Sequence, residues 1–112
     1  MARNAAERRK HKRHRIACPL SILRFGVAEP LKGKTLDLSD GGAILPIPIK
    51  AVPRVSERVR VVLAIPRSTA NTYMLEEVPC DARVVRHQPM EDNSLVGVAL
   101  QFSPTLDLAL EA

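Results

Sequence analysis

The sequence is poor in aromatic residues and has no tryptophan. Phe25, Tyr73 and Phe102 are its only Phe and Tyr residues, which amount to 3% of 112 residues. Single-stranded nucleic acids are commonly bound on platforms of aromatic side chains, and such a platform is hard to build here. The sequence also lacks a GxxxxGK[ST] loop and a GxGxxG turn, which excludes nucleotide binding through a P-loop or a Rossmann turn.

Long apolar runs are missing as well, and cysteines are few. No run approaches the roughly 20 residues of a membrane-spanning helix, and the basic start is not followed by the apolar region of a signal peptide. We therefore expect a cytoplasmic protein without membrane insertion. Cys18 and Cys80 are far apart in apolar surroundings, so we expect reduced thiols in the core rather than a disulfide.

The positive charge is concentrated at the N-terminus. The first fifteen residues hold seven Lys/Arg against one Glu, and the other residues hold ten Lys/Arg against eleven Asp/Glu. A basic end on a nearly neutral body predicts an arm that meets an anion, rather than a whole surface that lies along nucleic acid. The length suits one domain. We divide the chain into a flexible basic arm (1–15), a β-domain (16–102) and a C-terminal tail or short helix (103–112).

Apolar residues in the β-domain mostly recur at every second position, which is the period of a strand. The alternation is clearest from Val59 to Ile65. Pro19 indicates an edge strand, because proline cannot donate to a sheet ladder. We predict a turn at 26–33, a loop or hairpin tip at 66–76, and strands at 16–24, 34–38, 43–47, 58–65, 78–85 and 95–102.

Six short strands without a sustained helical period predict an all-β fold, either a small antiparallel barrel or a sandwich. Beyond the last strand, Ser103 could cap a short helix with Pro104 at its first position. Leu106 and Leu110 would then share one face of this helix and cover one end of the barrel.

The sequence offers neither a catalytic group nor a metal site. Ser39 would need a base to act as a nucleophile, and the N-terminal histidines lie among cations. The spacing of His11 and His14 occurs in metal sites, but the surrounding Lys and Arg would repel a divalent cation and no Cys or carboxylate cluster joins them. We predict no catalytic residues, no metal and no cofactor.

The stretch "DLSDGG" is the most informative part of the β-domain. Asp37 and Ser39 share one face of the predicted strand at 34–38, with Leu36 and Leu38 on the other. The glycines after them form either a plain hairpin turn or a bare backbone that a ligand approaches closely. A carboxylate accepts from the Watson–Crick edge of guanine, while an arginine fork fits its O6 and N7. With the basic arm, this stretch favours a guanine nucleotide bound without a P-loop.

Two motifs now make the chain comparable to a known family. "RRKHKR" fits an RRxxxR arm motif, "DLSDGG" fits [D/N]xSxxG, and "VGVALQF" is similar to a glycine-containing last strand. Between Glu7 and Phe102 the chain resembles a stand-alone PilZ domain protein. The resemblance implies a six-stranded antiparallel β-barrel that binds cyclic di-GMP, a bacterial second messenger, through Arg8, Arg9, Arg13, Asp37, Ser39 and Gly42.

The resemblance also implies a role for each of these residues. Arg9 and Arg13 would grip guanine and phosphate with help from Arg8, Asp37 and Ser39 would take the second half of the ligand, and Gly42 would permit close approach. We expect a receptor or adaptor that changes conformation on binding and relays the signal to an unidentified protein effector.

Two other interpretations of the arm stay open. The first is a nucleic-acid-binding barrel, whose affinity would fall steeply with salt. The second is a protein-interaction barrel with a solvated tail.

Overall fold

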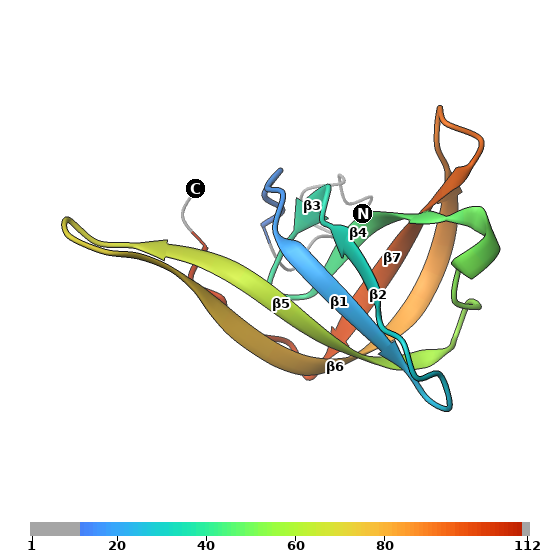
Figure 1. Ribbon diagram of the computed structural model, residues 1–112, viewed down its shortest axis with the longest axis horizontal. Helices are drawn as coiled ribbons and strands as arrows, with labels where there is room; N and C mark the ends of the chain where they lie inside the picture. The colour runs from blue at the N-terminus through green and yellow to red at the C-terminus, as the bar shows by residue number, and fades with distance from the viewer. Residues whose placement is uncertain (1–11, 111–112) are drawn as a thin grey trace, which may run out of the picture.

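The computed structural model describes residues 12–110. Its strands form a single antiparallel sheet in the order β2-β1-β5-β6-β7-β4-β3 (Figure 1). A short 3-10 helix, η1 (Ile49–Ala51), follows β4, and within 12–110 no helix is long and apolar enough to cross a membrane. The strands are β1 (Pro19–Arg24), β2 (Leu31–Lys34), β3 (Asp37–Leu38), β4 (Gly42–Pro48), β5 (Arg58–Ser68), β6 (Tyr73–Pro89) and β7 (Leu95–Ser103).

The two outermost strands of this sheet, β2 and β3, are consecutive in the chain. β2 pairs with β1 and β3 pairs with β4, so one stretch of chain joins both ends of the sheet and curls it into a barrel-like shape. Thr35 lies at the junction, where its buried hydroxyl donates to the carbonyl oxygen of Ile16 and accepts from the N–H of Cys18. The prediction of an all-β antiparallel fold is confirmed.

The strand predicted at 34–38 is wrong in its bounds, and residues 12–110 contain seven strands rather than six. The chain changes partners between Thr35, whose N–H donates to Cys18, and Leu36, whose N–H donates to Ile44 in β4. This change splits the expected strand into β2 and β3. Leu36 is exposed while Leu38 is fully buried, so these two leucines do not share a core face.

Two further corrections concern the first hairpin. The turn predicted at 26–33 ends earlier, since residues from Leu31 onward pair with β1. β1 is not an edge strand, because it lies between β2 and β5. Pro19 is tolerated because it is the first residue of β1, one of the positions where a strand accommodates proline.

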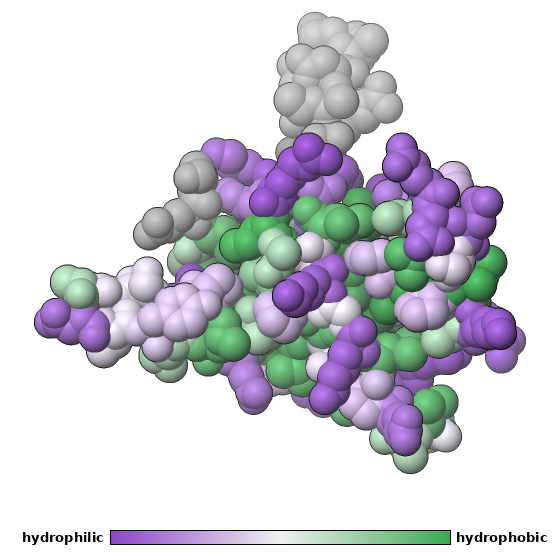
Figure 2. Space-filling view, turned by 45° about the horizontal axis from the view of Figure 1, so that its top comes forward, coloured by the Kyte–Doolittle hydropathy of each residue, from purple (hydrophilic) through white to green (hydrophobic). Residues whose placement is uncertain are grey.

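The loop predicted between Pro66 and Glu76 is mostly strand. β5 and β6 continue as a hairpin that projects from the body of the molecule, and only Thr69 to Thr72 form its turn (Figure 1, Figure 2). Pro66 does not end β5, since β5 pairs with β1 only as far as Leu63 and has one neighbour beyond it.

The chain from Pro104 to Leu110 contains no helix, so of the two alternatives predicted for this segment, a tail or a short helix, the structure has the tail. Leu106, Leu108 and Leu110 alternate with polar or small residues that are exposed. Leu108 is fully buried in the core and the other two pack against it. The leucines therefore do cover the core, but as a tail without a helix.

Core side chains come from every strand except β2 and from this tail. Both cysteines belong to the core and are free thiols, as predicted. Burial raises the pKa of the Cys18 thiol, and it raises the pKa of Cys80 to about 11. Both thiols are therefore harder to ionise than a free cysteine.

Candidate functional site

The end of the basic arm is fixed against β3 by a backbone bridge at His14. The N–H of His14 donates to the carbonyl oxygen of Leu38 at 2.8 Å, and the N–H of Leu38 donates to that of His14 at 2.9 Å. Since Arg13 precedes His14, and Asp37 and Ser39 flank Leu38, this bridge brings the arm and the second motif together.

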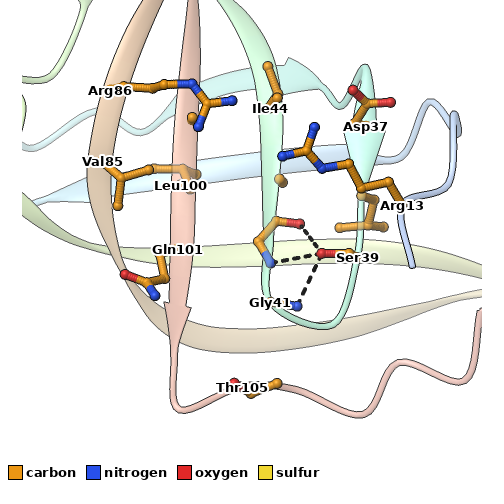
Figure 3. Close-up of a pocket in the computed structure, with 14 residues that line it drawn as sticks. Arg13, Asp37, Ser39, Gly41, Ile44, Val85, Arg86, Leu100, Gln101 and Thr105 are labelled. Atoms are coloured by element: carbon orange, nitrogen blue, oxygen red, sulfur yellow. Dashed lines mark hydrogen bonds between the residues drawn. The ribbon is translucent and has the colours of Figure 1, made fainter. Parts of the chain in front are cut away.

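An open cleft of about 520 Å³ lies at this junction (Figure 3). Arg13, Asp37, Ser39 and Gly42 all line it, so four of the six predicted site residues are close together. Arg8 and Arg9 lie outside the described residues. The cleft is lined by Arg13, Asp37, Leu38, Ser39, Gly41, Gly42, Ala43, Ile44, Val85, Arg86, Ala99, Leu100, Gln101 and Thr105.

The turn after β3 is held by Ser39. Its hydroxyl oxygen accepts from the N–H groups of Gly41 and Gly42, both at 3.2 Å, and its own N–H donates to the carbonyl oxygen of Gly42 at 2.9 Å. Ser39 is buried. Its hydroxyl thus shapes the wall of the cleft from within the turn, in the manner of a serine that bonds its own backbone.

Packing within the sheet leaves no room for a side chain at Gly42. A Cβ atom at this position would lie 2.0 Å from the carbonyl oxygen of Leu100 in β7. Gly42 pairs with Gln101, and the strands β4 and β7 approach so closely here that only glycine fits. Close approach of backbone to backbone therefore accounts for this glycine, whether or not a ligand also approaches it.

Arg86 was missed from the sequence, although it lines the wall opposite Arg13. The register of β6 against β7 shifts between Val84 and Arg86, and this bulge at Val85 turns both Val85 and Arg86 into the cleft. Figure 3 shows the Arg13 and Arg86 side chains extending into the cleft from opposite sides. The two consecutive valines before Arg86 break the strand alternation, which is the signal that could have revealed it.

The floor of the cleft is apolar. Ile44 and Ala99 are paired across β4 and β7 and are buried, yet they lie outside the core cluster, on the outer side of the sheet. Two guanidinium groups and the carboxylate of Asp37 thus surround an apolar floor, which suits a flat ligand that carries both hydrogen-bonding edges and negative charge. Among residues 12–110 no group of three His, Cys, Asp or Glu side chains could hold a metal ion.

Comparison with protein families decides the classification. The model of the PilZ domain matches residues 7–112, which is almost the whole chain. The chain belongs to the PilZ domain family. The resemblance drawn from the RRxxxR and [D/N]xSxxG motifs is thereby confirmed. The cleft described above is lined by Arg13 of the first motif and by Asp37, Ser39 and Gly42 of the second.

Solved structures agree with this PilZ fold. The inhibitor of motility MotI/DgrA of Bacillus subtilis superposes with a TM-score of 0.74 at 15% identity, over 90% of this chain and 44% of that one. This chain therefore spans less than half of MotI/DgrA. The PilZ domain of Escherichia coli YcgR, solved with c-di-GMP, gives a TM-score of 0.52 at 15% identity, over 85% of this chain and 77% of that one. No curated protein gave a match.

Proposed function

We propose that this PilZ domain is a receptor for cyclic di-GMP. The observation that carries the proposal is the bridge between His14 and Leu38, because it brings Arg13 of the first motif into one cleft with Asp37 and Ser39 of the second. The PilZ domain of YcgR, which has a similar fold, was solved with this ligand.

Each wall of the cleft has a role in this proposal. Arg13 and Arg86 supply cations for phosphates or for the O6 and N7 acceptors of guanine, and the carboxylate of Asp37 accepts from the guanine Watson–Crick edge. A base lies over the apolar floor of Ile44 and Ala99. The proposed site also includes Arg8 and Arg9, because they belong to the same RRxxxR motif as Arg13.

Contacts from Arg13 and Arg86 alone would not supply the free energy of micromolar binding. Charge-assisted contacts contribute about 1.5–3 kcal/mol each, so Arg13 and Arg86 together supply roughly 3–6 kcal/mol. Micromolar binding requires about 8 kcal/mol. In this proposal the apolar floor and the remaining arginines of the arm supply the difference.

Calorimetric titration with cyclic di-GMP tests this site. Arg13→Ala should weaken binding about tenfold or more, since it removes one charge-assisted contact. Arg15→Ala is the matched control, because Arg15 is equally charged, exposed and near Arg13 but does not line the cleft. Equal affinities of the two variants would remove Arg13 from the site.

Competition with cyclic di-AMP tests how the base is recognised. The wild-type protein should bind cyclic di-GMP more tightly than cyclic di-AMP. In Asp37→Ala the ratio of the two affinities should be smaller, because the acceptor for the guanine N–H groups is lost. Equal wild-type affinity for the two dinucleotides would contradict guanine recognition through Asp37.

The proposal includes a binding and adaptor role without enzymatic activity, in which ligand at the arm changes the surface offered to a protein effector. It also includes a cytoplasmic location, which the two free buried thiols support. Retention of cyclic di-GMP binding at high salt, with weak oligonucleotide binding, would separate this function from nucleic-acid binding through the arm.

A further inference from the structure

A second and larger groove lies beside the proposed ligand cleft. Its volume is about 1080 Å³, and it shares Gln101 and Thr105 with that cleft. Four arginines and a single acidic residue line it, so we call it the arginine groove. Its charged residues are Arg24, Arg58, Arg60, Arg83 and Asp81, and the exposed side chains of Leu23 and Phe25 also line it.

Two of these arginines already have partners. Arg24 donates to both carboxylate oxygens of Glu57, at 2.7 and 3.0 Å, in a partly buried pair. Arg60 and Asp81 approach to 3.6 Å, but both side chains are about two-thirds exposed, at 67% and 66%. A loose and exposed pair of this kind is readily exchanged for another anion.

The other two arginines face each other without a counter-charge. Arg58 on β5 is directly opposite Arg83 on β6. Within 12–110 neither has an ion-pair partner, and Arg83 makes only a long hydrogen bond of 3.4 Å to the side-chain oxygen of Gln101. Like charges directly opposite on neighbouring strands are destabilising, so this pair is suited to an anionic group that binds between them.

Apolar groups stand next to these cations. Phe25 is fully exposed and Leu23 is 44% exposed. A ligand that combines carboxylates with apolar side chains would neutralise Arg58 and Arg83 and cover Phe25 at the same time. A nucleic acid fits less well, because Phe25 is the one aromatic residue with an exposed ring in the groove, and a base-stacking platform needs several such rings.

We propose that the arginine groove binds an acidic peptide segment of a partner protein. Carboxylates of the segment pair with Arg58 and Arg83, and an apolar side chain of the segment packs on Phe25. The row of paired residues Arg58, Arg83, Gln101 and Gly42 runs from this groove into the proposed cyclic di-GMP cleft, so a bound segment would lie beside that cleft.

A titration without cyclic di-GMP tests the groove independently of the proposed function. The probe is a short synthetic peptide in which Glu alternates with Leu and Phe, added to the isotope-labelled full chain and followed by amide chemical shifts. We expect shifts at Phe25, Arg58, Arg83 and Gln101. A matched peptide with Gln in place of Glu should bind about tenfold or more weakly, because the charge-assisted contacts are lost.

Variants of the protein complete the test. The double variant Arg58→Gln/Arg83→Gln should bind the acidic peptide about tenfold or more weakly. Arg54→Gln, which removes one exposed arginine outside the groove, should change the affinity less than about twofold. The double variant should melt at the same temperature as the wild-type protein or higher, since it removes a repulsive pair.

Three results would overturn the proposal. The first is a set of shifts confined to residues 1–15, which would mean that the arm alone attracts the peptide. The second is an equal loss of affinity in Arg54→Gln and in the double variant, which would mean non-specific charge attraction. The third is displacement of the peptide by a single-stranded oligonucleotide that binds more tightly, which would identify a nucleic acid as the occupant.

Discussion

Replacing Gly42 with alanine would separate two explanations for the last residue of the second motif. The added Cβ atom would lie 2.0 Å from the carbonyl oxygen of Leu100 and 3.4 Å from the Cα atom of Gln101. Carbon and oxygen that are not bonded rarely approach closer than about 3.3 Å, so β4 and β7 would have to separate by about 1 Å. The conflict is purely steric, because Gly26 is the only glycine between residues 12 and 110 with a positive φ.

The size of the effect follows from the bonds at this point of the sheet. Separation of the strands strains the bond from the N–H of Phe102 to the carbonyl oxygen of Gly41, and it disturbs the bonds that Ser39 makes in the turn. An unpaired buried backbone group costs about 1–3 kcal/mol, and overpacking adds about 1–3 kcal/mol. We expect Gly42→Ala to lower the free energy of unfolding by about 2–6 kcal/mol, a large part of the 5–15 kcal/mol typical of a domain.

Urea denaturation of both forms measures this loss directly. Gly33→Ala is the matched control, since its Cβ atom would meet a side-chain atom, Cδ1 of Leu45, at 3.3 Å, and the nearest backbone atom at 3.5 Å. That side chain can move, so the control should lose about 1 kcal/mol or less. Wild-type stability of Gly42→Ala combined with weaker cyclic di-GMP binding would refute the steric argument and assign this glycine to ligand approach.

Three further predictions test the interactions around the site. Hydrogen bonds from Arg24 hold the pKa of Glu57 below its ordinary value of about 4.3, so the stabilisation is present above that pH and is lost as pH falls through the lower folded pKa. Glu57→Gln should therefore lose about 1 kcal/mol at neutral pH and nothing in strong acid, as measured by thermal melting across pH; a pH-independent loss would contradict the ion pair. Asp40→Ala should speed amide exchange at Leu108, whose N–H donates to the Asp40 carboxylate at 2.9 Å, whereas Asp40→Asn keeps an acceptor and should change it little. With a pKa of about 11, Cys80 is ionised in about one molecule in a thousand at pH 8, so mass spectrometry should detect slow alkylation of the native protein, and prompt labelling would contradict its burial.

The strands that were predicted well are those in which one face is buried along the whole element. Val59, Val61, Leu63 and Ile65 alternate because β5 has the core on one side, and the structure buries all four. The predicted elements were wrong at two kinds of position. One is where a strand changes its pairing partner, as at Thr35, and the other is where the spacing of apolar residues fits both a helix and an extended chain. The leucines of the C-terminal tail fit both a helix and an extended chain, and only the contacts of that tail decide between them.

Those contacts come from distant parts of the chain. The carbonyl and carboxylate oxygens of Asp40 accept from the N–H groups of Leu106 and Leu108, and the guanidinium of Arg67 donates to the carbonyl oxygen of Leu108 at 2.6 Å. The backbone of Leu108 is thus bonded to the side chains of Asp40 and Arg67, which lie 68 and 41 residues earlier in the chain. No local pattern carries that information.

The candidate site divides in the same way. The residue types of Arg13, Asp37 and Ser39 and their spacing within each motif are local properties, so the sequence alone was enough to predict a basic arm, an acidic strand end and a glycine turn. Their convergence, and the entry of Arg86 into the same cleft, depend on the His14 bridge to Leu38 and on the bulge at Val85. Both depend on backbone pairing between residues that are far apart in the chain. Such pairing is fixed only when the whole sheet folds around its core.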